Sequence, residues 1–534
     1  MRILGLLSSH DCSFCVLEDG VPTIHAELER YIREKEPEGD PISFFEDVCK
    51  GDIKFDQVAV IQGFVEHMSE KFPDGLRRLS EMLSSNDAKL NVFGHHQSHA
   101  ANAFYSSNFD EALIVTLDGG GLDKDMDGKV MPTSFSVWEG YGAKINKIAA
   151  FHSTIMNIGF AWQRVTKLVF NLSSGHPVGN QAGTVMAMAC MGDPSKHLDY
   201  FEKFNFRTSC YSEDTPCNDG VFDFPKMRKI ASKSEQDSFD VAAALQKATE
   251  NKVKDIFDAL IVDLDTRNLC LSGGVFLNSV LTGKLYDWYG HIFDNIYVCP
   301  VAYDSGLAIG AAQYLWHHVL DNPKVKWSDN CTPYLGEAYQ CELESILQNK
   351  NLEYKRVTDD EVLDLLDKQN IVSVFKGPSE SGRRALGGRS ILADPRSGEM
   401  KALINDKVKH RQWFRPFAPS ILREEVHKWF EKDIDSPYMS FVIKFKKDMR
   451  DKVPAVVHYD GTARLQTVTE NDNEWYYNFL LKWKEKSGVP ILLNTSFNDR
   501  EPIVENYEHA INCYLGTDID YLYFVDDGIL VNKF

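Results

Sequence analysis

Three histidines lie close together early in the chain and could bind a metal ion. His95, His96 and His99 fall within five residues of a protein that has 16 histidines in all. On a helix, His95 and His99 would share one face, and two imidazoles on one face can hold a transition metal. The metalloprotease motif HExxH needs a glutamate where this chain has His96, so that class is excluded. A polar helix start with solvated histidines is the alternative interpretation.

A predicted strand over residues 112–117 runs into Asp118, Gly119 and Gly120. Glycines at the end of a strand let the backbone approach a phosphate closely, and a carboxylate there can meet a metal ion. A simple turn is the alternative, because many such glycines only reverse the chain. Asp118 is therefore a candidate metal ligand, and the two glycines are candidate phosphate contacts.

The acidic segment 123–128 resembles a calcium site. It matches the first half of an EF-hand loop, but Ser134 stands at the twelfth position, where the bidentate glutamate belongs. The residues that follow favour a strand over the exiting helix of an EF-hand. We therefore predict an acidic hairpin turn at 123–128.

Two further polar or glycine-rich segments each precede a predicted helix. Gly273 and Gly274 follow a strand over 268–271, and Asp304 precedes a helix with small residues at 310–312. The order of strand, glycine turn and helix favours an α/β domain with ligands at the ends of its strands. A longer helical pattern runs from about Ser238 to residue 263, with a serine expected at its N-cap.

Residues 376–415 carry ten Lys plus Arg and four Asp plus Glu, a local charge of +6 in a chain whose net charge is −20. Arginine binds phosphate or carboxylate through two hydrogen bonds, and lysine adds a compact charge. These basic residues alternate with glycine, proline and aromatic residues and form no helical stripe, which favours an anion pocket over a solvated charged face. Two later polar segments, 458–464 and 490–498, could add hydroxyl and amide groups, with simple polar turns as the alternative.

Length and charge limit the classes of function. At about 150 residues per domain, a chain of 534 residues predicts two to four domains. A net charge of −20 excludes a non-specific binder of nucleic acid or of membrane surfaces, because its mean field repels phosphate. The chain has no 18-residue apolar run and no apolar N-terminal region of signal-peptide length, so we expect a cytoplasmic protein without a membrane span.

The composition also indicates how the chain is divided. Residues 321–339 have the proline, glycine and polar content of a linker, and the basic texture begins beyond them, so we place a domain boundary near residue 340. No internal repeat is visible. Cys12 and Cys15, the one close pair among eleven cysteines, lie in an apolar run that predicts a strand, and we expect reduced core thiols.

Eight segments spread over nearly the whole chain occur in a characteristic order: HHQSHAANAFYSS, LDGGG, LSGGVFLN, DSGLAIGAA, GRRALGGRSILADPR, FRPFAPS, DGTARLQTV and LLNTSFN. Together they resemble the O-carbamoyltransferases of the nodulation and antibiotic-tailoring type. The resemblance implies an α/β fold with an N-terminal actin-like ATPase (ASKHA, Kae-like) domain over residues 1–340. It also implies a YrdC-like α/β domain over residues 341–534.

The resemblance implies a two-step reaction with ATP and carbamoyl phosphate as co-substrates. The C-terminal site forms carbamoyl adenylate, and the N-terminal metal site transfers the carbamoyl group to an acceptor hydroxyl and releases AMP. A carbamate is a poor electrophile, and adenylation supplies a good leaving group that is best kept from water.

The acceptor stays open at this point. It is a hydroxyl-bearing small molecule of sugar or polyketide type, or the hydroxymethyl group of a modified pyrimidine of the 5-hydroxymethylcytosine type, in a nucleotide or in DNA. Threonylcarbamoyl transfer to tRNA and a non-catalytic actin-like nucleotide-binding scaffold are further alternatives. An oligomer is compatible with each of them.

The resemblance also assigns roles to individual residues. His10 is expected to be the base that accepts the proton of the acceptor hydroxyl. The expected metal ligands are His95, His99, Asp118 and Asp304, with Fe²⁺ at this site and Mg²⁺ accompanying ATP. The expected nucleotide contacts are Gly119, Gly120, Gly273, Gly274 and Asn278. Carbamoyl phosphate and the adenylate are expected at Lys409, Arg415, Arg464, Asn494 and Ser496.

Three positions depart from the family's usual pattern. Residues 30–36 lack the histidine of an Arg-Lys-His run near the acceptor, Arg383 replaces a proline, and Gln412 stands where glutamate is usual. The first departure leaves the acceptor open and gives His10 more of the role of base. The other two affect the adenylation site mildly.

Overall fold

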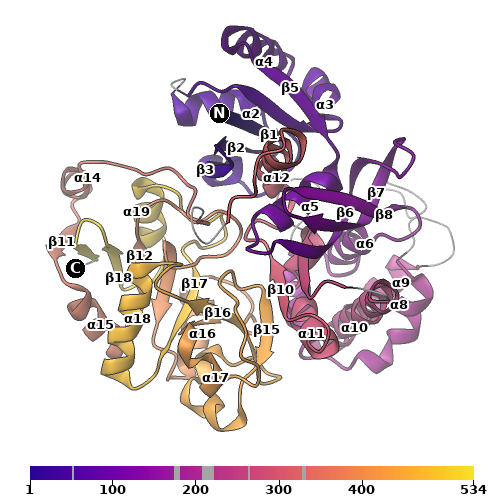
Figure 1. The fold of residues 1–534 in the computed structure, drawn as a ribbon. Helices are drawn as coiled ribbons and strands as arrows, with labels where there is room; N and C mark the ends of the chain where they lie inside the picture. Colours follow the sequence, from indigo (N-terminus) through magenta and orange to yellow (C-terminus); the bar gives the residue numbers. More distant parts are fainter. Residues whose placement is uncertain (51–52, 174–180, 207–221, 263–264, 327–331, 534) are drawn as a thin grey trace. The chain divides into compact units, whose positions relative to one another are not determined.

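The chain forms two compact units, Met1–Cys331 and Thr332–Phe534, in a computed structural model (Figure 1). The structure describes residues 1–50, 53–173, 181–206, 222–262, 265–326 and 332–533. Part of the predicted linker, residues 327–331, lies outside the described residues. Both units combine β-sheets with helices, so the predicted α/β class is confirmed. No helix in the described ranges is both long and apolar enough to span a bilayer.

The N-terminal unit contains two five-stranded sheets with the same topology. The first has the order β3-β2-β1-β4-β5, with antiparallel pairs β1–β2 and β2–β3 and parallel pairs β1–β4 and β4–β5. The second has the order β10-β9-β6-β7-β8, with antiparallel pairs β6–β7 and β7–β8 and parallel pairs β6–β9 and β9–β10. The fold therefore contains an internal repeat that the sequence does not show.

The strands of these two sheets have the following bounds. They are β1 (Arg2–Leu7), β2 (Ser13–Glu18), β3 (Val21–Glu27), β4 (Gln57–Ile61), β5 (Lys89–Phe93), β6 (Glu111–Lys124), β7 (Val130–Tyr141), β8 (Lys144–His152), β9 (Asn268–Ser272) and β10 (Asn295–Val298). Cys15 lies in β2 and Cys12 precedes it, and both are buried, as expected for core thiols.

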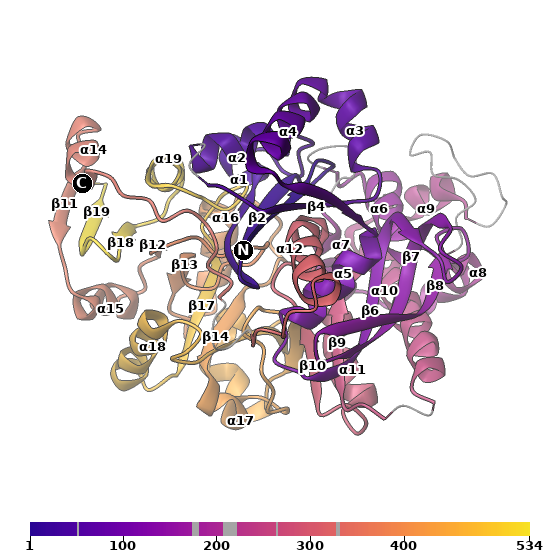
Figure 2. The same cartoon turned by 45° about the horizontal axis from the view of Figure 1, so that its top comes forward.

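Two helices pack against these sheets and against each other. α12 (Leu307–Gln313) contacts β1, β2 and β4, whereas α5 (His95–Tyr105) contacts β6, β7 and β9. Figure 2 shows the two helices side by side. A Cβ at Gly310 would lie 1.9 Å from Ser98 O, so the small residues at 310–312 allow the close crossing of α12 over α5.

The described residues of this unit form further helices. They are α1 (Leu28–Ile32), α2 (Pro41–Cys49), α3 (Phe64–Lys71), α4 (Pro73–Asn86), α6 (Ile158–Arg164), η1 (Val165–Val169), α7 (Ala182–Ala189), η2 (Pro194–Lys196), α8 (Leu198–Phe204), α9 (Phe224–Ala231), α10 (Glu235–Leu260), η3 (Gly274–Leu277), α11 (Ser279–Tyr289), η4 (Asp304–Gly306) and η5 (Tyr314–Val319). The long helix α10 begins before the predicted Ser238, because Ser234 Oγ accepts a hydrogen bond from Asp237 N at 3.1 Å and caps it.

The C-terminal unit is built on a nine-stranded mixed sheet of order β11-β19-β18-β12-β13-β17-β14-β16-β15. Its strands are β11 (Glu353–Arg356), β12 (Val372–Phe375), β13 (Arg389–Ala393), β14 (Ala418–Leu422), β15 (Phe441–Lys444), β16 (Thr462–Val468), β17 (Ile491–Ser496), β18 (Tyr521–Phe524) and β19 (Ile529–Asn532). The central strands β13, β17 and β14 place the predicted basic segment and the 490–498 segment next to each other.

Helices of this unit pack against the sheet and form with it a hydrophobic core. This core includes Trp483 and Phe479 of α18. The helices are α14 (Leu343–Asn349), α15 (Asp359–Asp367), α16 (Glu399–Lys407), η6 (Arg423–Glu425), α17 (Val426–Trp429), η7 (Lys447–Lys452), η8 (Pro454–Val456), α18 (Glu474–Ser487) and α19 (Tyr507–Leu515).

Candidate functional site

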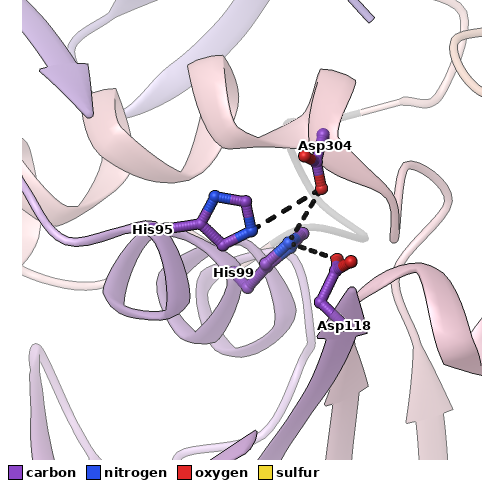
Figure 3. Close-up of side chains that lie close together, drawn as sticks. All are labelled: His95, His99, Asp118 and Asp304. Atoms are coloured by element: carbon purple, nitrogen blue, oxygen red, sulfur yellow. Dashed lines mark ion pairs between the residues drawn. The ribbon is translucent and has the colours of Figure 1, made fainter. Parts of the chain in front are cut away.

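Four side chains from three separate parts of the N-terminal unit converge on one point. His95 and His99 come from α5, Asp118 from β6, and Asp304 from the short helix η4 that leads into α12 (Figure 3). One ligand atom of each residue lies within 4.8 Å of the corresponding atom of every other. The structure thus brings together all four residues expected as metal ligands, which we call the donor cluster.

The imidazole nitrogens of the donor cluster face carboxylate oxygens. His99 Nε2 lies 3.0 Å from Asp118 Oδ2 and 3.4 Å from Asp304 Oδ1, and His95 Nε2 lies 3.7 Å from Asp304 Oδ1. Both Nε2 atoms are buried without a hydrogen bond of normal geometry. A buried polar atom in that state is costly, whereas two imidazoles and two carboxylates suit a divalent transition metal. The residues present therefore fit a metal ion.

Ser272 sets the tautomer of His99. Its hydroxyl donates to Ala302 O at 3.2 Å, so its oxygen accepts from His99 Nδ1–H at 3.1 Å. The lone pair of His99 Nε2 then points at the two carboxylates, an arrangement that needs a cation or a proton between them. Burial lowers the pKa of His99, but Asp118 and Asp304 more than offset it and raise the pKa to about 9. A proton thus takes the place of the cation when no metal is bound.

The other members of the donor cluster have the charge states that metal ligands need. Burial lowers the pKa of His95, which keeps its imidazole neutral. Burial alone would raise the pKa of Asp304, but the neighbouring His95 and His99 hold it well below its usual range. Neutral imidazole and ionised carboxylate are the ligand forms of these side chains.

His96 lies outside the donor cluster and belongs to a buried hydrogen-bond chain. Its Nε2–H donates to Thr133 O at 2.9 Å, so its Nδ1 accepts from the Thr116 hydroxyl at 2.6 Å. Thr116 in turn accepts from Ser136, whose oxygen accepts from Trp138 Nε1 at 2.7 Å. His96 therefore fastens α5 to the β6–β7 hairpin, a role that the sequence could not separate from metal binding.

His10 lies beside the donor cluster, in the turn between β1 and β2. Its Nε2 is 3.5 Å from Asp304 Oδ2 and its Nδ1 is 3.4 Å from Asp11 Oδ2. Its side chain is 32% exposed, so a ligand can reach it. Burial lowers the pKa of His10, but the hydrogen bond to Asp11 and the charges of Asp304, Asp11 and Glu36 raise it to about 10.

The first glycine turn differs from the prediction. β6 does not end at Asp118 but continues through Gly119 and Gly120 to Lys124, with a register shift between Leu117 and Gly121. Gly120 adopts a φ of +126°, which only glycine takes readily, so the glycines form a bulge in a long hairpin. The predicted acidic turn at 123–128 is confirmed, since Gly128 N donates to Asp125 O at 3.2 Å and closes the hairpin.

The second glycine turn orders the donor cluster. A Cβ at Gly273 would lie 2.1 Å from Leu117 O, so β6 and β9 can approach only with glycine there. Gly274 N donates to Asp118 Oδ2 at 2.9 Å and orients that carboxylate. Asn278 caps α11 through Leu281 N at 3.1 Å and donates to Gln246 at 2.8 Å. These three predicted nucleotide contacts thus lie next to Asp118 or at the start of the following helix.

A group of arginines lies close together in the C-terminal unit. It consists of Arg384, Arg411, Arg415 and Arg464, which we call the arginine cluster. Burial and then the charges of the three others hold the pKa of Arg464 well below its usual range. Burial also lowers the pKa of Arg415 to about 10. Buried like charges that repel one another are stabilised by an anion, so the chemistry of these side chains suits a phosphate group.

Lys409 and Ser496 meet each other directly. Lys409 is buried, and its Nζ donates to Asn498 O at 2.7 Å and to Asn498 Oδ1 at 2.6 Å, as well as to Ser496 O. Ser496 Oγ donates to Asn498 Oδ1 at 2.7 Å. This lysine therefore orders the 496–498 turn.

Asn494 is held in one orientation by its neighbours. Its Nδ2 donates to Ala385 O at 3.1 Å and to Gln466 Oε1 at 2.8 Å, while Gln466 Nε2 donates to Leu386 O at 3.1 Å. Asn494 Oδ1 is buried without a hydrogen-bond partner. The amide of Asn494 thus joins β17 to the glycine-rich loop before β13, and its Oδ1 could accept a hydrogen bond from a ligand.

Not every basic residue of segment 376–415 belongs to the arginine cluster. Arg389 is fully buried and donates to backbone carbonyls, including Glu505 O and Gly377 O, and Arg396 pairs with Asp394 at 2.7 Å. Glu380, which sequence reasoning passed over, accepts from Leu386 N at 2.5 Å and folds the loop around its carboxylate. The local charge of +6 therefore overstated the number of side chains available to a ligand.

Comparisons with known proteins agree across both units. Residues 56–313 match the family model Carbamoyltransferase N-terminus, and residues 363–533 match Carbamoyltransferase C-terminus. The chain is 33% identical to nodulation protein NolO of Bradyrhizobium diazoefficiens over 82% of this chain and 78% of that protein. It is 31% identical to an uncharacterized protein of Synechocystis sp. over 98% of this chain and 95% of that protein.

Other similarities cover less or are weaker. Nodulation protein NolNO of Sinorhizobium fredii is 34% identical over 81% of this chain, which spans 63% of that relative's length. Among solved structures, full-length HypF in the phosphate- and nucleotide-bound form covers 60% of this chain and 56% of its own, with 14% identity and a TM-score of 0.34. A structural likeness of that size carries no argument about this chain.

Proposed function

Because the chain belongs to the carbamoyltransferase family and is thus an enzyme that transfers carbamoyl groups, we propose that it is an O-carbamoyltransferase. In this proposal, water cleaves carbamoyl phosphate to carbamate and phosphate, and the carbamate attacks the α-phosphorus of ATP, which expels pyrophosphate and gives carbamoyl adenylate. The carbamoyl group then goes to an acceptor hydroxyl, and AMP leaves. The observation that carries it is the position of His10, 3.5 Å from a carboxylate of the donor cluster and open to a ligand. That arrangement pairs a proton acceptor with a metal site.

The C-terminal unit would form the adenylate. The arginine cluster would hold the phosphate groups of carbamoyl phosphate and ATP, with Arg415 and Arg464 as the principal contacts. Lys409 and Ser496 would support it through the 496–498 turn, and Asn494 through its unpartnered oxygen. We assign this step to residues 341–534 as a YrdC-like domain.

The domain proposed over residues 1–340, which includes the N-terminal unit, would carry out the transfer. Its two sheets of identical topology support an actin-like domain. The bulge at Gly119 and Gly120, the turn at Gly273 and Gly274, and Asn278 would face the nucleotide. His95, His99, Asp118 and Asp304 would hold a divalent ion, Fe²⁺ in our proposal with Mg²⁺ accompanying ATP, and such an ion would supply positive charge to offset the negative charge on the leaving AMP.

His10 would act as the base in this transfer. The charge of Asp304 favours protonated His10 in the metal-free site. Once Asp304 serves as a metal ligand, its charge is shared and the pKa of His10 falls toward the working range of a base. His10 Nε2 then accepts the proton of the acceptor hydroxyl as that oxygen attacks the carbamoyl carbon.

The acceptor in this proposal is a hydroxyl-bearing small molecule of sugar or polyketide type. A hydroxymethylated pyrimidine, in a nucleotide or in DNA, is the second candidate, and the net charge of −20 counts against contact with a long duplex. We place the reaction in the cytoplasm, and an oligomer is compatible with it.

The test has two parts. The purified chain is expected to exchange pyrophosphate into ATP only when carbamoyl phosphate is present. A panel of hydroxylated metabolites, hydroxymethylated nucleosides and oligonucleotides is then screened for the mass gain of one carbamoyl group. Exchange that does not depend on carbamoyl phosphate would contradict the adenylate step, and a gain only on nucleosides or oligonucleotides would select the second acceptor.

A further inference from the structure

Helix α5, which carries both histidines of the donor cluster, has no N-cap side chain that accepts from its first turn, although Gln97 Oε1 accepts from Gly94 N at 3.0 Å. Its N-cap is Gly94, and the N–H of Gln97 in the first turn needs an acceptor. Asp123 supplies one from 26 residues further along the chain, because its Oδ2 accepts from Gln97 N at 2.9 Å. A carboxylate at this position also meets the positive end of the helix dipole.

Gly94 and Asp123 are complementary in shape. A Cβ at position 94 would lie 2.2 Å from Asp123 Oδ1, so a side chain there would push the carboxylate away. Gly94 has φ −71° and ψ 153°, which any residue can adopt, so space and not backbone conformation requires the glycine. A glycine at the N-cap therefore makes room for a cap that comes from another element.

Asp123 is held from two further directions. Its Oδ1 accepts from Lys124 N at 2.8 Å and from Lys147 Nζ on β8 at 2.9 Å, and its side chain is 2% exposed. Lys147 Nζ in turn lies 4.7 Å from the ring centroid of Trp138 on β7. The carboxylate thus ties β6 and β8 to the first turn of α5 in one buried contact.

Three of the four residues of the donor cluster stand on the two elements that Asp123 joins. Asp118 lies five residues before it on β6, and His95 and His99 lie on either side of Gln97 on α5 (Figure 3). We propose that Asp123 is a positioning residue that fixes α5 against β6 so that these side chains converge on a metal ion. The proposal rests on the proposed function, because it needs a metal ion at the donor cluster, and it adds the group that sets the cluster's geometry.

The test titrates Co²⁺ alone into the full-length chain and follows its visible absorption, which depends on ligand number and geometry. Groups that orient metal ligands typically change affinity by about 10–100-fold. We expect Asp123→Ala to weaken Co²⁺ binding at least about tenfold and to shift the absorption bands. Asp123→Asn keeps one acceptor oxygen for Gln97 N–H and is expected to lose less. The exposed Asp127, in the same acidic turn, provides the matched control Asp127→Asn, which should bind Co²⁺ like the parent.

A second variant approaches the same contact from the helix. Gly94→Ala should displace the Asp123 carboxylate and weaken Co²⁺ binding to a similar extent. The double variant Gly94→Ala, Asp123→Ala should bind Co²⁺ no more weakly than the weaker of the two single variants. The reason is that both substitutions remove the same contact between Asp123 and α5. Additive losses would contradict this.

The outcomes separate the two proposals. If Asp123→Ala folds by circular dichroism and binds Co²⁺ like the parent with unchanged bands, Asp123 only stabilises the helix and the inference is wrong. If Asp123→Ala does not fold, Asp123→Asn is judged by the same two readouts. If the parent itself binds no Co²⁺, the metal centre of the proposed function fails, and the inference fails with it.

Discussion

The donor cluster and the arginine cluster are built on opposite electrostatic principles. The donor cluster balances two imidazoles against two carboxylates, and a proton on His99 can complete it when no metal is bound. The arginine cluster gathers like charges whose burial and mutual repulsion hold the pKa of Arg464 far below its usual range. The side chains of the first site suit a cation, and those of the second suit an anion.

The two clusters therefore select ligands of opposite charge. The ligand of the donor cluster must be small and positively charged, because one ligand atom of each residue lies within 4.8 Å of the others. The ligand of the arginine cluster must be negative and able to accept several hydrogen bonds, as a phosphate group is. Changes in one cluster are therefore expected to leave the chemistry of the other intact.

The largest effect is expected from removing both histidines of α5. His95→Ala with His99→Ala should abolish bound divalent metal and acceptor carbamoylation, because two of the four donors are lost. Pyrophosphate exchange dependent on carbamoyl phosphate should survive, since it belongs to the arginine cluster. Metal analysis and the exchange assay on the same preparation check both statements, and full metal content would show that the donor cluster is not the metal site.

A change at His10 is expected to slow carbamoyl transfer while metal binding and adenylate formation are retained. His10→Asn should reduce acceptor carbamoylation by about a hundredfold or more, the usual range for losing a general base. Adenylate formation and metal content should stay at parental values. Both products are quantified in one reaction, and parental transfer would mean that another group serves as base.

Arg415→Ala tests the arginine cluster. The loss of a charged hydrogen-bond partner typically costs about 2–5 kcal/mol, so the exchange rate should fall roughly thirtyfold or more. Arg356, an exposed arginine of the same unit that pairs with Glu344, provides the control Arg356→Ala, which should exchange normally. An Arg415→Ala rate close to that of the control would remove this residue from the phosphate site.

The smallest effect expected is a gain in stability at the arginine cluster. Arg464→Met keeps the bulk of the side chain and removes one of the buried, mutually repelling charges. Replacing buried charges with apolar groups is often neutral or stabilising by about 1–4 kcal/mol. Each kcal/mol of added stability raises the thermal unfolding midpoint by about 2–4 °C for a unit of this size. Without phosphate, the midpoint should therefore rise by a few degrees. Calorimetry measures this midpoint. A lower midpoint for Arg464→Met than for the parent would contradict the proposed repulsion among the four arginines.

Local patterns in the sequence predicted much of the fold. The helix at His95, the turn at 123–128 and the strand before Gly273 were readable because spacing, turn residues and β-branched runs act over a few residues. The end of the strand at Asp118 was predicted wrongly, because its continuation past Gly120 depends on pairing with β7. The repeated topology of the two sheets left no mark in the sequence, since strand order is decided by long-range pairing.

The candidate site divides in the same way. The functional groups of the site could be predicted from the sequence. They are two imidazoles four residues apart on one helix face, a carboxylate beside glycines, and an excess of basic side chains in one segment. Three roles are visible only in the tertiary structure: His96 bonds to Thr116 and Thr133, Ser272 sets the tautomer of His99, and Asp123 caps α5. Those roles depend on hydrogen bonds between residues 20 to 173 positions apart, and no local pattern encodes contacts at that separation.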